Sequence, residues 1–582
     1  MTNAGTISAV LAGSGALTKN GAGTSTLSGA NTFTGGVSLN AGTLAISANS
    51  ALGNGSVTIA SNAIISGLTN LNVTNGIAVS TGAAGTLDVA STFTQTNTGV
   101  ISGAGSLVKA GAGTLQLAAS NTYTGGLTVD AGTVILSGSG TLTATNGTVK
   151  IGAGTVNLGG LSRTNGAFTL DTGTLTNGTL TASSFGLTNA GTVSAVLAGS
   201  GALTKSGSGN ATLSGANTFS GGATVNAGTL TLSGSGTLGA TNGALTIGAG
   251  TVNLGGLSRT NGAFTLDTGT LTNGTLTATS YSLTNSGTIS ANLAGTGALT
   301  KSGSGTATLS GANTYSGGTT VSGGTLVGNT TSLVGNITNN AVVEFGQATA
   351  GTYSNVISGS GAFRKSGVGE LTLNQANTYS GGTTVNQGTL KLNRAGNGNG
   401  GTILGTIAVN GGTLLLGQAN QISDSSAINL SGGTINTGGF ADQVGQLTVS
   451  ANSSISGLVA TSGSTSNQFL FSSVNLTNYA TDSGSTLNLG SYSYNSTITF
   501  ASSGANTWTG YGDGTSLNNF ANKIQFGNSG LKAQISFTSG ANGLTYVTAI
   551  PEPKVYVAMA MLVALVGAAE YRRRRSAKSA AV

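Results

Sequence analysis

One pattern recurs along this chain and limits the folds that are open to it. The pattern G-x-G-x-[LF]-x-K-x-G-x-G begins at Gly13, Gly103, Gly199, Gly295 and Gly359, and each copy continues into an N-T-[YF]-[ST]-G-G turn. Successive copies start 90, 96, 96 and 64 residues apart, and residues 137–222 are nearly identical to residues 233–318. Such self-similarity is typical of architectures in which each unit packs only on its neighbours. Because the spacings differ, we expect whole coils to have been gained or lost between copies.

The segments between the glycines predict short β-strands. GTLTLSGSG, which begins at Gly228, alternates apolar and polar residues with a period of two, so one face of the strand points inward. Clusters of Gly, Asn and Ser supply the turns between strands. The sequence therefore predicts an all-β fold, a single-stranded parallel β-helix (β-solenoid) with roughly 20–25 residues per coil and a rise of about 4.8 Å per coil.

Composition supports uninterrupted strands and excludes several classes of function. The only two prolines are Pro551 and Pro553, so the preceding residues contain none to interrupt a strand ladder. Much of the net charge of +7 comes from the last 32 residues, and the rest is nearly neutral, which argues against nucleic-acid binding. Cys and His are absent, which removes thiol chemistry, disulfides and the commonest metal ligand. We predict no metal, nucleotide or other cofactor site.

Two duplicated pairs are the strongest candidates for catalysis. Arg163 precedes Asp171 by eight residues, and Arg259 precedes Asp267 by the same interval. Arg and Asp on an outer groove serve some β-helical polysaccharide lyases. The alternative is a surface ion pair or solvated charges, and we favour it because no second carboxylate lies nearby in the sequence.

Two further residue types recur at fixed positions of the repeat. The lysines are Lys19, Lys109, Lys205, Lys301 and Lys365. We expect them at strand ends, with the aliphatic stem packed and the ammonium group in water. Attraction to an acidic polysaccharide is the functional alternative. The aromatic residue of each N-T-[YF] turn either packs across the turn, which we favour, or stacks on a sugar.

The tail combines a polar tripeptide, an apolar stretch and a basic cluster. Val555 to Ala569 carries no charge, and as a helix it would extend about 22 Å, which is short for a bilayer core of about 30 Å. Flanking basic and tyrosine side chains can extend its reach. Because Lys and Arg next to a span stay cytoplasmic, we expect the cluster Arg572, Arg573, Arg574 and Arg575 inside the cell and residues 1–550 outside. A buried amphipathic helix is the alternative.

The order of these parts resembles the PEP-CTERM sorting signal of Gram-negative bacteria. The match comprises the tripeptide Pro551, Glu552 and Pro553, a transmembrane helix over 555–569, and the arginine cluster, within a segment of 550–582. The resemblance implies processing by a membrane protease-transpeptidase, the exosortase, after export. It also implies an inner-membrane intermediate with a cytoplasmic C-terminus, then a cell-surface or extracellular location.

The repeat itself resembles the autotransporter-associated β-strand repeat. Its elements are the G-x-G-x-L-x-K run and the N-T-Y-S-G-G turn, and the resemblance covers residues 1–440. It implies a right-handed β-helix of the kind found in secreted bacterial passengers. This chain departs from that resemblance, since the tail stands where such proteins have a C-terminal barrel, and we therefore expect that it does not translocate itself.

Residues 441–549 differ from the repeats in their aromatic content. They hold 12 aromatic residues, among them Trp508, against 14 in residues 1–440. Since a solenoid end must be covered, we expect irregular final coils and a cap there, followed by one C-terminal helix. Met1 falls inside a repeat, so we also expect the natural protein to begin further upstream, with a signal peptide.

These features predict a non-enzymatic, exported protein of the cell surface or extracellular matrix. It would be a β-helical rod acting as a spacer or adhesin, with the exosortase, the membrane and an extracellular polysaccharide as candidate partners, and no nucleic acid. The alternative is a β-helical enzyme that binds or degrades polysaccharide. A groove with three or more clustered charged side chains favours the enzyme, whereas a Thr/Ser/Asn surface favours the rod.

Overall fold

In the computed structural model the chain is a parallel β-solenoid, as the sequence predicts. The structure describes residues 1–2, 4–396 and 401–457, together with the strands β49 to β54 further on. The chain divides into two units, Met1–Gly317 and Gly318–Val582, which are described separately. The described residues form no helix, and they therefore contain none that is long and apolar enough to cross a membrane. The cap predicted over 441–549 lies largely outside the described residues, and the predicted helix 555–569 lies wholly outside them.

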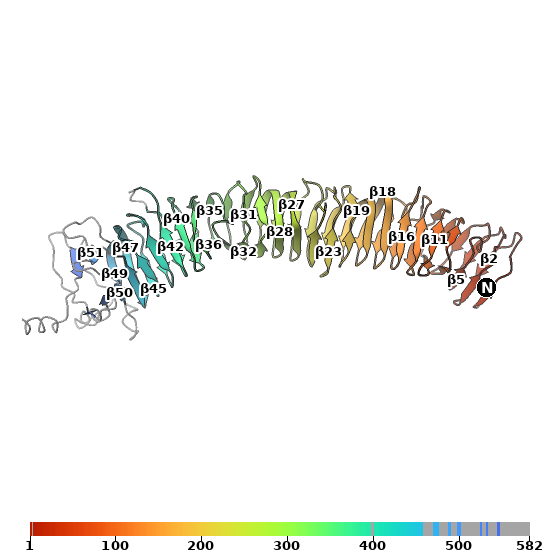
Figure 1. Ribbon diagram of the computed structural model, residues 1–582, viewed down its shortest axis with the longest axis horizontal. Helices are drawn as coiled ribbons and strands as arrows, with labels where there is room; N and C mark the ends of the chain where they lie inside the picture. Colours follow the sequence, from red (N-terminus) through yellow and green to blue (C-terminus); the bar gives the residue numbers. More distant parts are fainter. Residues whose placement is uncertain are drawn as a thin grey trace, which may run out of the picture. The chain divides into compact units, whose positions relative to one another are not determined.

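In the first unit, hydrogen-bonded strands form stacks in which neighbours belong to successive coils (Figure 1). The shortest stack consists of β2 (Leu17–Lys19), β4 (Val37–Leu39), β6 (Val57–Ile59), β9 (Ile77–Val79) and β12 (Ile101–Ser102). The second consists of β1 (Gly5–Ile7), β3 (Thr24–Leu27), β5 (Thr43–Ile46), β7 (Ile64–Gly67), β10 (Ala84–Val89), β13 (Ser106–Ala110), β15 (Leu127–Val129), β17 (Val149–Ile151), β18 (Thr155–Leu170), β19 (Thr174–Leu187), β22 (Ala202–Lys205), β24 (Ala223–Val225), β26 (Leu245–Ile247), β27 (Thr251–Leu266), β28 (Thr270–Leu283) and β31 (Ala298–Lys301).

A third stack in this unit shares the long strands β18, β19, β27 and β28, which bend around the coil. Its other members are β8 (Leu71–Val73), β11 (Thr94–Asn97), β14 (Thr114–Leu117), β16 (Thr133–Leu136), β20 (Thr192–Val193), β23 (Asn210–Leu213), β25 (Thr229–Leu232), β29 (Gly287–Ile289) and β32 (Thr306–Leu309). β21 (Val196–Ala198) and β30 (Asn292–Ala294) pair in parallel with the middle of β19 and of β28.

The second unit repeats this arrangement. One stack holds β33 (Thr319–Val321), β35 (Ile337–Asn339) and β38 (Ile357–Ser358). Another holds β34 (Thr325–Gly328), β36 (Val342–Gly346), β39 (Ala362–Ser366), β41 (Thr383–Val385), β43 (Ile407–Val409), β45 (Ile428–Ser431), β47 (Asp442–Ala451), β49 (Phe469–Asn475), β51 (Ile498–Ala501) and β54 (Leu544–Val547). The last holds β37 (Gly351–Tyr353), β40 (Glu370–Leu373), β42 (Thr389–Leu392), β44 (Thr413–Leu416), β46 (Thr434–Asn436), β48 (Ser453–Ser456), β50 (Leu487–Leu489), β52 (Ile524–Phe526) and β53 (Leu531–Lys532). Pairing is parallel except for β51 with β54 and β52 with β53, which are antiparallel.

The spacing of the repeats has a different cause from the one that we expected. Lys19 lies in β2, whereas Lys109 lies in β13, which stacks on the column of β3, the strand that follows β2 in the chain. The interval of 90 residues therefore moves the repeat to a neighbouring stack, and the expectation of whole coils gained or lost is wrong there. The interval of 96 residues keeps the stack, because Lys109 and Lys205 share one column of register partners.

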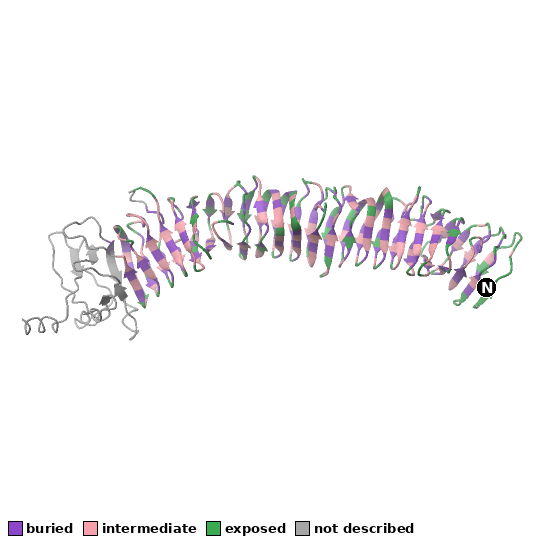
Figure 2. Cartoon of the chain, in the orientation of Figure 1, coloured by how far each residue is buried: buried purple, intermediate pink, exposed green. Residues whose placement is uncertain are grey.

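Alternate residues of the strands fill a narrow apolar interior (Figure 2). Leu, Val and Ile side chains that point inward are almost completely buried, and their neighbours along each strand are partly exposed. Aromatic side chains stack on one another inside the coils. Phe185 packs between Phe168 and Phe219, with ring centroids 6.4 Å and 5.6 Å away. Because each residue contacts only the coils above and below it, stability is built from neighbour-to-neighbour terms.

We expect Phe185→Ala to destabilise its own coil and the adjacent ones by about 3–5 kcal/mol, because a large buried ring is replaced by a cavity. Hydrogen exchange of the β19 and β22 amides measures the loss locally. Phe93→Ala, which truncates a partly exposed ring, is the control and costs much less. Equal losses of protection in the two variants would contradict this account of the interior.

Candidate functional site

The recurring lysines form caps on the turns that follow them, and their ammonium groups are not in water. All five side chains are completely buried, which corrects the expected solvent-exposed position. Lys109 Nζ donates to the carbonyls of Ala110, Gly111 and Ala131 at 2.6, 2.7 and 3.3 Å. Lys365 Nζ donates to Ser366, Gly367 and Gln387 at 2.7, 2.7 and 3.1 Å. We call this arrangement the lysine cap.

The other three lysines bond in the same way. Lys19 donates to the carbonyls of Gly21 and Ala41, Lys205 to those of Gly207 and Ala227, and Lys301 to those of Ser302 and Gly303. Burial lowers the pKa of Lys205 and Lys301, and it lowers the pKa of Lys109 and Lys365 to about 8. At neutral pH the Lys109 and Lys365 ammonium groups therefore remain mostly charged. They are occupied by backbone carbonyls, so a ligand outside the coil does not reach them.

A glycine of the following coil makes room for the caps of Lys109 and Lys205. Gly132 has a φ of 65°, and a Cβ built on it would lie 2.7 Å from Lys109 Nζ. Gly228 has a φ of 62°, and its Cβ would lie 2.8 Å from Lys205 Nζ. Both the positive φ and the close approach require glycine at this position. The glycine at this position has a positive φ in all five copies, at Gly42, Gly132, Gly228, Gly324 and Gly388.

The asparagine of the N-T-[YF] turn bridges successive coils. Asn121 Oδ1 accepts a hydrogen bond from the Ile101 backbone N at 2.9 Å, and its Nδ2 donates to the Thr141 carbonyl at 2.7 Å. Asn217 does the same with Leu197 N and Thr237 O, both at 2.9 Å. Each partner lies 20 residues away, one coil before or after. We call this the asparagine bridge, and its acceptor half recurs at Asn31, Asn313 and Asn377.

The aromatic residues of the same turns pack inside, as expected. Phe33, Tyr123, Phe219, Tyr315 and Tyr379 are all buried. The Tyr123 hydroxyl donates to the Leu142 carbonyl, and the Tyr379 hydroxyl pairs with Thr383 Oγ1 at 2.7 Å. Burial raises the pKa of both tyrosines above the ordinary value. These rings therefore have no face available for stacking on a sugar.

The two Arg/Asp pairs are not brought together. Arg163 is partly exposed and reaches back one coil, where its Nε and one terminal nitrogen donate to the carbonyls of Gly140 and Gly138 at 2.6 and 3.4 Å. Asp171 instead accepts from Thr188 Oγ1 at 3.1 Å in the next coil. Arg259 and Asp267 repeat this pattern with Gly236, Gly234 and Thr284. Neither the lyase-like pair nor an ion pair forms, because each group bonds to a different neighbouring coil.

A buried carboxylate in the second unit was missed by the sequence analysis. Asp442 Oδ2 accepts from the backbone N of Gln421 and Ile422 at 2.8 and 3.0 Å, while Oδ1 is buried and has no hydrogen-bond partner among the described residues. Burial, opposed by backbone hydrogen bonds and reinforced by Asp424, raises the pKa of Asp442 to about 7. Gln421 continues the network, since its Oε1 accepts from Arg394 N and Thr402 Oγ1, each at 2.7 Å.

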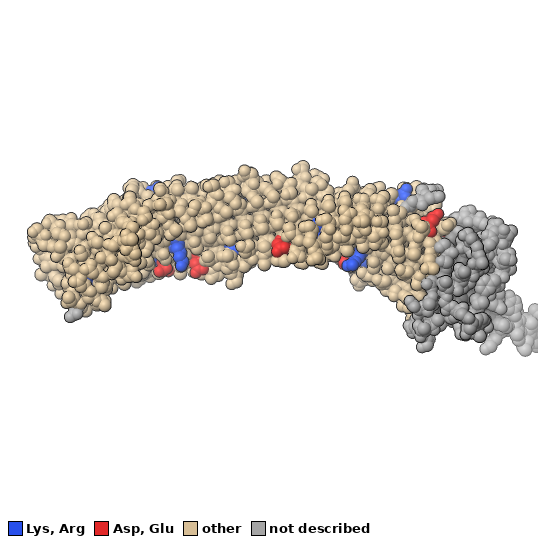
Figure 3. All heavy atoms as spheres, turned by 180° about the vertical axis from the view of Figure 1, so that it is seen from behind, with Lys and Arg blue, Asp and Glu red and all other residues tan. Residues whose placement is uncertain are grey.

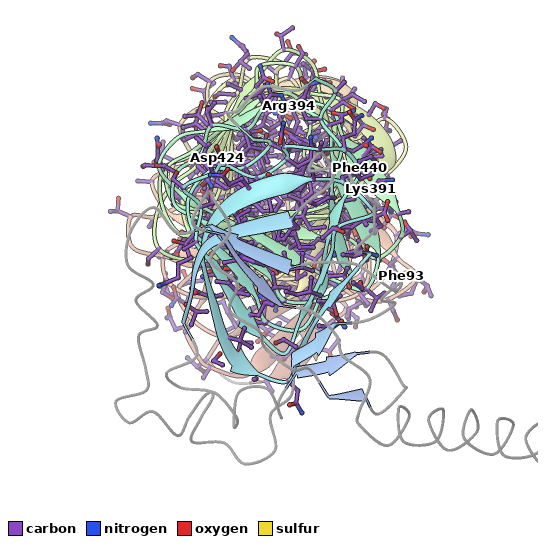
Figure 4. The ribbon with its side chains drawn as sticks, turned by 90° about the vertical axis from the view of Figure 1, so that its left-hand side faces the viewer. Phe93, Lys391, Arg394, Asp424 and Phe440 are labelled. Atoms are coloured by element: carbon purple, nitrogen blue, oxygen red, sulfur yellow. The ribbon has the colours of Figure 1, made fainter. Side chains whose placement is uncertain are left out.

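Charged side chains outside these caps are sparse. Figure 3 shows them on one face as isolated spots, with no large patch of either sign. Viewed along the stack in Figure 4, Arg394 and Asp424 come from separate places around the coil. Within the described part of the chain, no three Asp or Glu residues gather in a way that suits a metal ion. The predicted sorting residues Pro551, Glu552 and Pro553 and the cluster Arg572–Arg575 lie outside the described residues.

Comparisons with known proteins identify the repeat. A model of the passenger-associated-transport-repeat family matches the chain five times, at residues 17–46, 107–136, 203–232, 299–327 and 363–392. A search of curated proteins and a search of solved structures found no match. The autotransporter-associated repeat predicted from the sequence is thereby confirmed. Such passenger repeats imply an exported, cell-surface or extracellular protein.

Each matched segment contains one lysine cap and the asparagine of one bridge, so the family pattern coincides with contacts between coils. Sequence reasoning found the lysine and the aromatic residue but not the bridge. Regular recurrence of Asn in the N-T-[YF] turn was the available signal. Asp442 gave no such signal, because it lies outside the repeats.

We expect Lys109→Met to reduce the local free energy of unfolding by about 1–3 kcal/mol, because buried carbonyls lose their donor. Hydrogen exchange of the amides at 110–113 measures the change. Lys150→Met is the control, since Lys150 is exposed and lies two coils further on in the same stack. If the two variants exchange alike, the cap does not hold its turn.

Asp442 predicts a pH dependence of the second unit. Its folded pKa of about 7 lies above the ordinary 3.8, so between these values the folded state retains a proton that the unfolded state releases. Local stability is therefore greatest below pH 3.8, falls as the pH rises from there to about 7, and changes little above that. Exchange of the Gln421 and Ile422 amides, corrected for intrinsic rate, follows this change. Asp442→Asn removes the dependence, and an unchanged slope in that variant would refute the assignment.

Proposed function

We propose that this chain is a non-enzymatic, exported β-helical protein that acts as a spacer or adhesin at the cell surface or in the extracellular matrix. The supporting observation is the use of the repeat's polar residues. The lysine caps and asparagine bridges are spent on contacts between coils, and the aromatic residues of the turns are buried. The recurring lysines, asparagines and turn aromatics are thus part of the scaffold and are not free for binding or catalysis.

An adhesive role rests on repetition. Outward positions carry mainly Thr, Ser and Asn, and similar surfaces recur from coil to coil. Weak contacts that repeat along one scaffold gain affinity through effective concentration. A neutral extracellular polysaccharide is a candidate partner, because such a surface offers hydroxyl groups and little charge.

We further propose that the tail directs sorting. Pro551, Glu552 and Pro553, the apolar stretch 555–569 and the arginine cluster 572–575 stand in the order of the PEP-CTERM signal. In this scheme the chain crosses the inner membrane, pauses with its C-terminus in the cytoplasm, and is processed by an exosortase.

Fractionation of cells that express the full-length gene tests the sorting proposal. We expect the wild-type chain to leave the inner membrane only when the exosortase is present. A variant with Pro551→Ala and Pro553→Ala should stay in the inner membrane uncut, because the tripeptide is the recognised element. Immunoblotting of each fraction measures the distribution.

Lys578→Ala, which lies beyond the arginine cluster, is the matched control and should sort normally. Release of the double proline variant at the wild-type level, or release without the exosortase, would contradict sorting through this tail. Neither result would alter the assignment of the repeats.

A further inference from the structure

One outward column of the first unit is almost entirely threonine. Ten register partners in ten successive strands follow one another along the stack: Thr94, Thr114, Thr133, Thr155, Thr174, Thr192, Thr212, Thr231, Asn253 and Thr272. We call this the threonine column. Since adjacent strands lie about 4.8 Å apart, one side chain of the column is repeated at that interval.

The hydroxyl groups of this column are available to a ligand. All nine threonines are partly or fully exposed. Within the described part of the chain none of these hydroxyls forms a hydrogen bond to another residue, whereas hydroxyls nearby do, such as Thr172 and Thr188. Threonine also has few χ1 rotamers, so the column is a rigid array and loses little entropy when it binds.

Strand propensity alone does not account for the column. Threonine is favoured in strands, but so are Val, Ile and Tyr. Two residues further along the same strands, the outward positions hold Gln116, Ile135 and Asn157, which shows that other side chains fit. The outward column on the second stack is interrupted by Lys150 and Gly186, although Thr or Ser occupies it in the six strands that follow, from Thr204 to Thr300, and no second hydroxyl column lies beside it among the described residues.

A second column lies beside the first and makes the array two-dimensional. It contains Asn210, Thr229, Thr251, Thr270, Thr288 and Thr308. Asn210, Thr229, Thr251 and Thr270 stand two positions before Thr212, Thr231, Asn253 and Thr272 of the threonine column, about 6.6 Å along a strand, while Thr288 and Thr308 continue the second column beyond the end of the first. Over the four strands β23, β25, β27 and β28 the face is therefore a grid of hydroxyl, methyl and amide groups with two regular spacings, about 4.8 Å and about 6.6 Å.

The chemistry of the grid narrows the choice of ligand. Neither column contains a charged residue, so an acidic polymer finds no counter-charge. Neither contains an aromatic residue, so a sugar chain would form hydrogen bonds there without a stacking contact, and retention on a polysaccharide is therefore kept as an outcome of the test. The ligand that fits the grid best is ice. Its oxygen atoms repeat in two dimensions at distances close to those of the grid, and each can donate a hydrogen bond to a hydroxyl group or accept one from it.

We propose that the threonine face, consisting of the threonine column and the column beside it, binds the surface of ice. Hydroxyls at fixed spacing hold water molecules at lattice positions, and the methyl groups between them shed disordered water. Each contact is weak, but the threonines of successive strands are held rigidly and contact the ice surface together. The activity goes beyond a spacer role and requires only that the face be exposed to freezing water.

The test is an ice recrystallisation assay with the purified full-length chain, matched for buffer and detergent. We expect the wild-type protein to slow the growth of ice grains and to be incorporated, when fluorescently labelled, into a growing ice hemisphere. The variant Thr212→Tyr/Thr231→Tyr places two large rings on the grid and should lose both effects.

The matched control is Thr169→Tyr/Thr265→Tyr, which changes two equally exposed threonines on the outward column of the second stack. It should behave as the wild type, and circular dichroism checks that both variants fold. Wild-type grain growth equal to that with serum albumin, or equal loss in both variants, would overturn the proposal. Retention of the wild type on a neutral polysaccharide without any effect on ice would also overturn it. Because the assay uses purified protein, its failure is separate from failure of sorting.

Discussion

The whole structure depends on hydrogen bonds between the backbone amide and carbonyl groups of one coil and those of the next. Parallel strands solve this problem along the faces, but every coil must also turn, and turns leave carbonyl and amide groups without strand partners. In the repeats, the lysine cap binds the carbonyls of one turn, and the asparagine bridge binds an amide one coil back and a carbonyl one coil forward. The recurring lysines and asparagines are tolerated inside a thin apolar core because they are hydrogen-bonded there.

This requirement explains why the family pattern has its particular residues. Lys is long enough to reach the turn from an inward strand position, and Gly132 leaves space for its ammonium group. Asn offers an acceptor and a donor in one planar group, which suits simultaneous contact with the coils on both sides. The interval between copies is free to vary, and after 90 residues the same unit lies on a different stack. The lysine cap and the asparagine bridge recur together as one local unit, whereas the stack on which that unit lies differs between copies.

The fold was predictable because period-two strands, glycine turns and repeats all point to a β-solenoid. The surroundings of the lysines were not predictable, because a lysine at an exposed strand end and a lysine in a buried cap have the same sequence pattern. Arg163 and Asp171 are close in sequence, yet the coil directs them to opposite neighbours, which only the register between coils reveals. Asp442 escaped notice because burial, and not its sequence context, makes it unusual. The threonine column likewise appears only when residues about 20 positions apart are aligned in space.

The central claim is that the recurring lysines and asparagines of the repeat hold coils together and do not serve a ligand. The most direct test is the hydrogen-exchange protection of the Leu197 amide, whose only side-chain partner among the described residues is Asn217. In Asn217→Ala that amide loses its acceptor while its strand remains, and we expect protection to fall by about 1–3 kcal/mol in free energy. Unchanged protection at Leu197 would contradict the claim, because the bridge would then contribute nothing to the contact between coils.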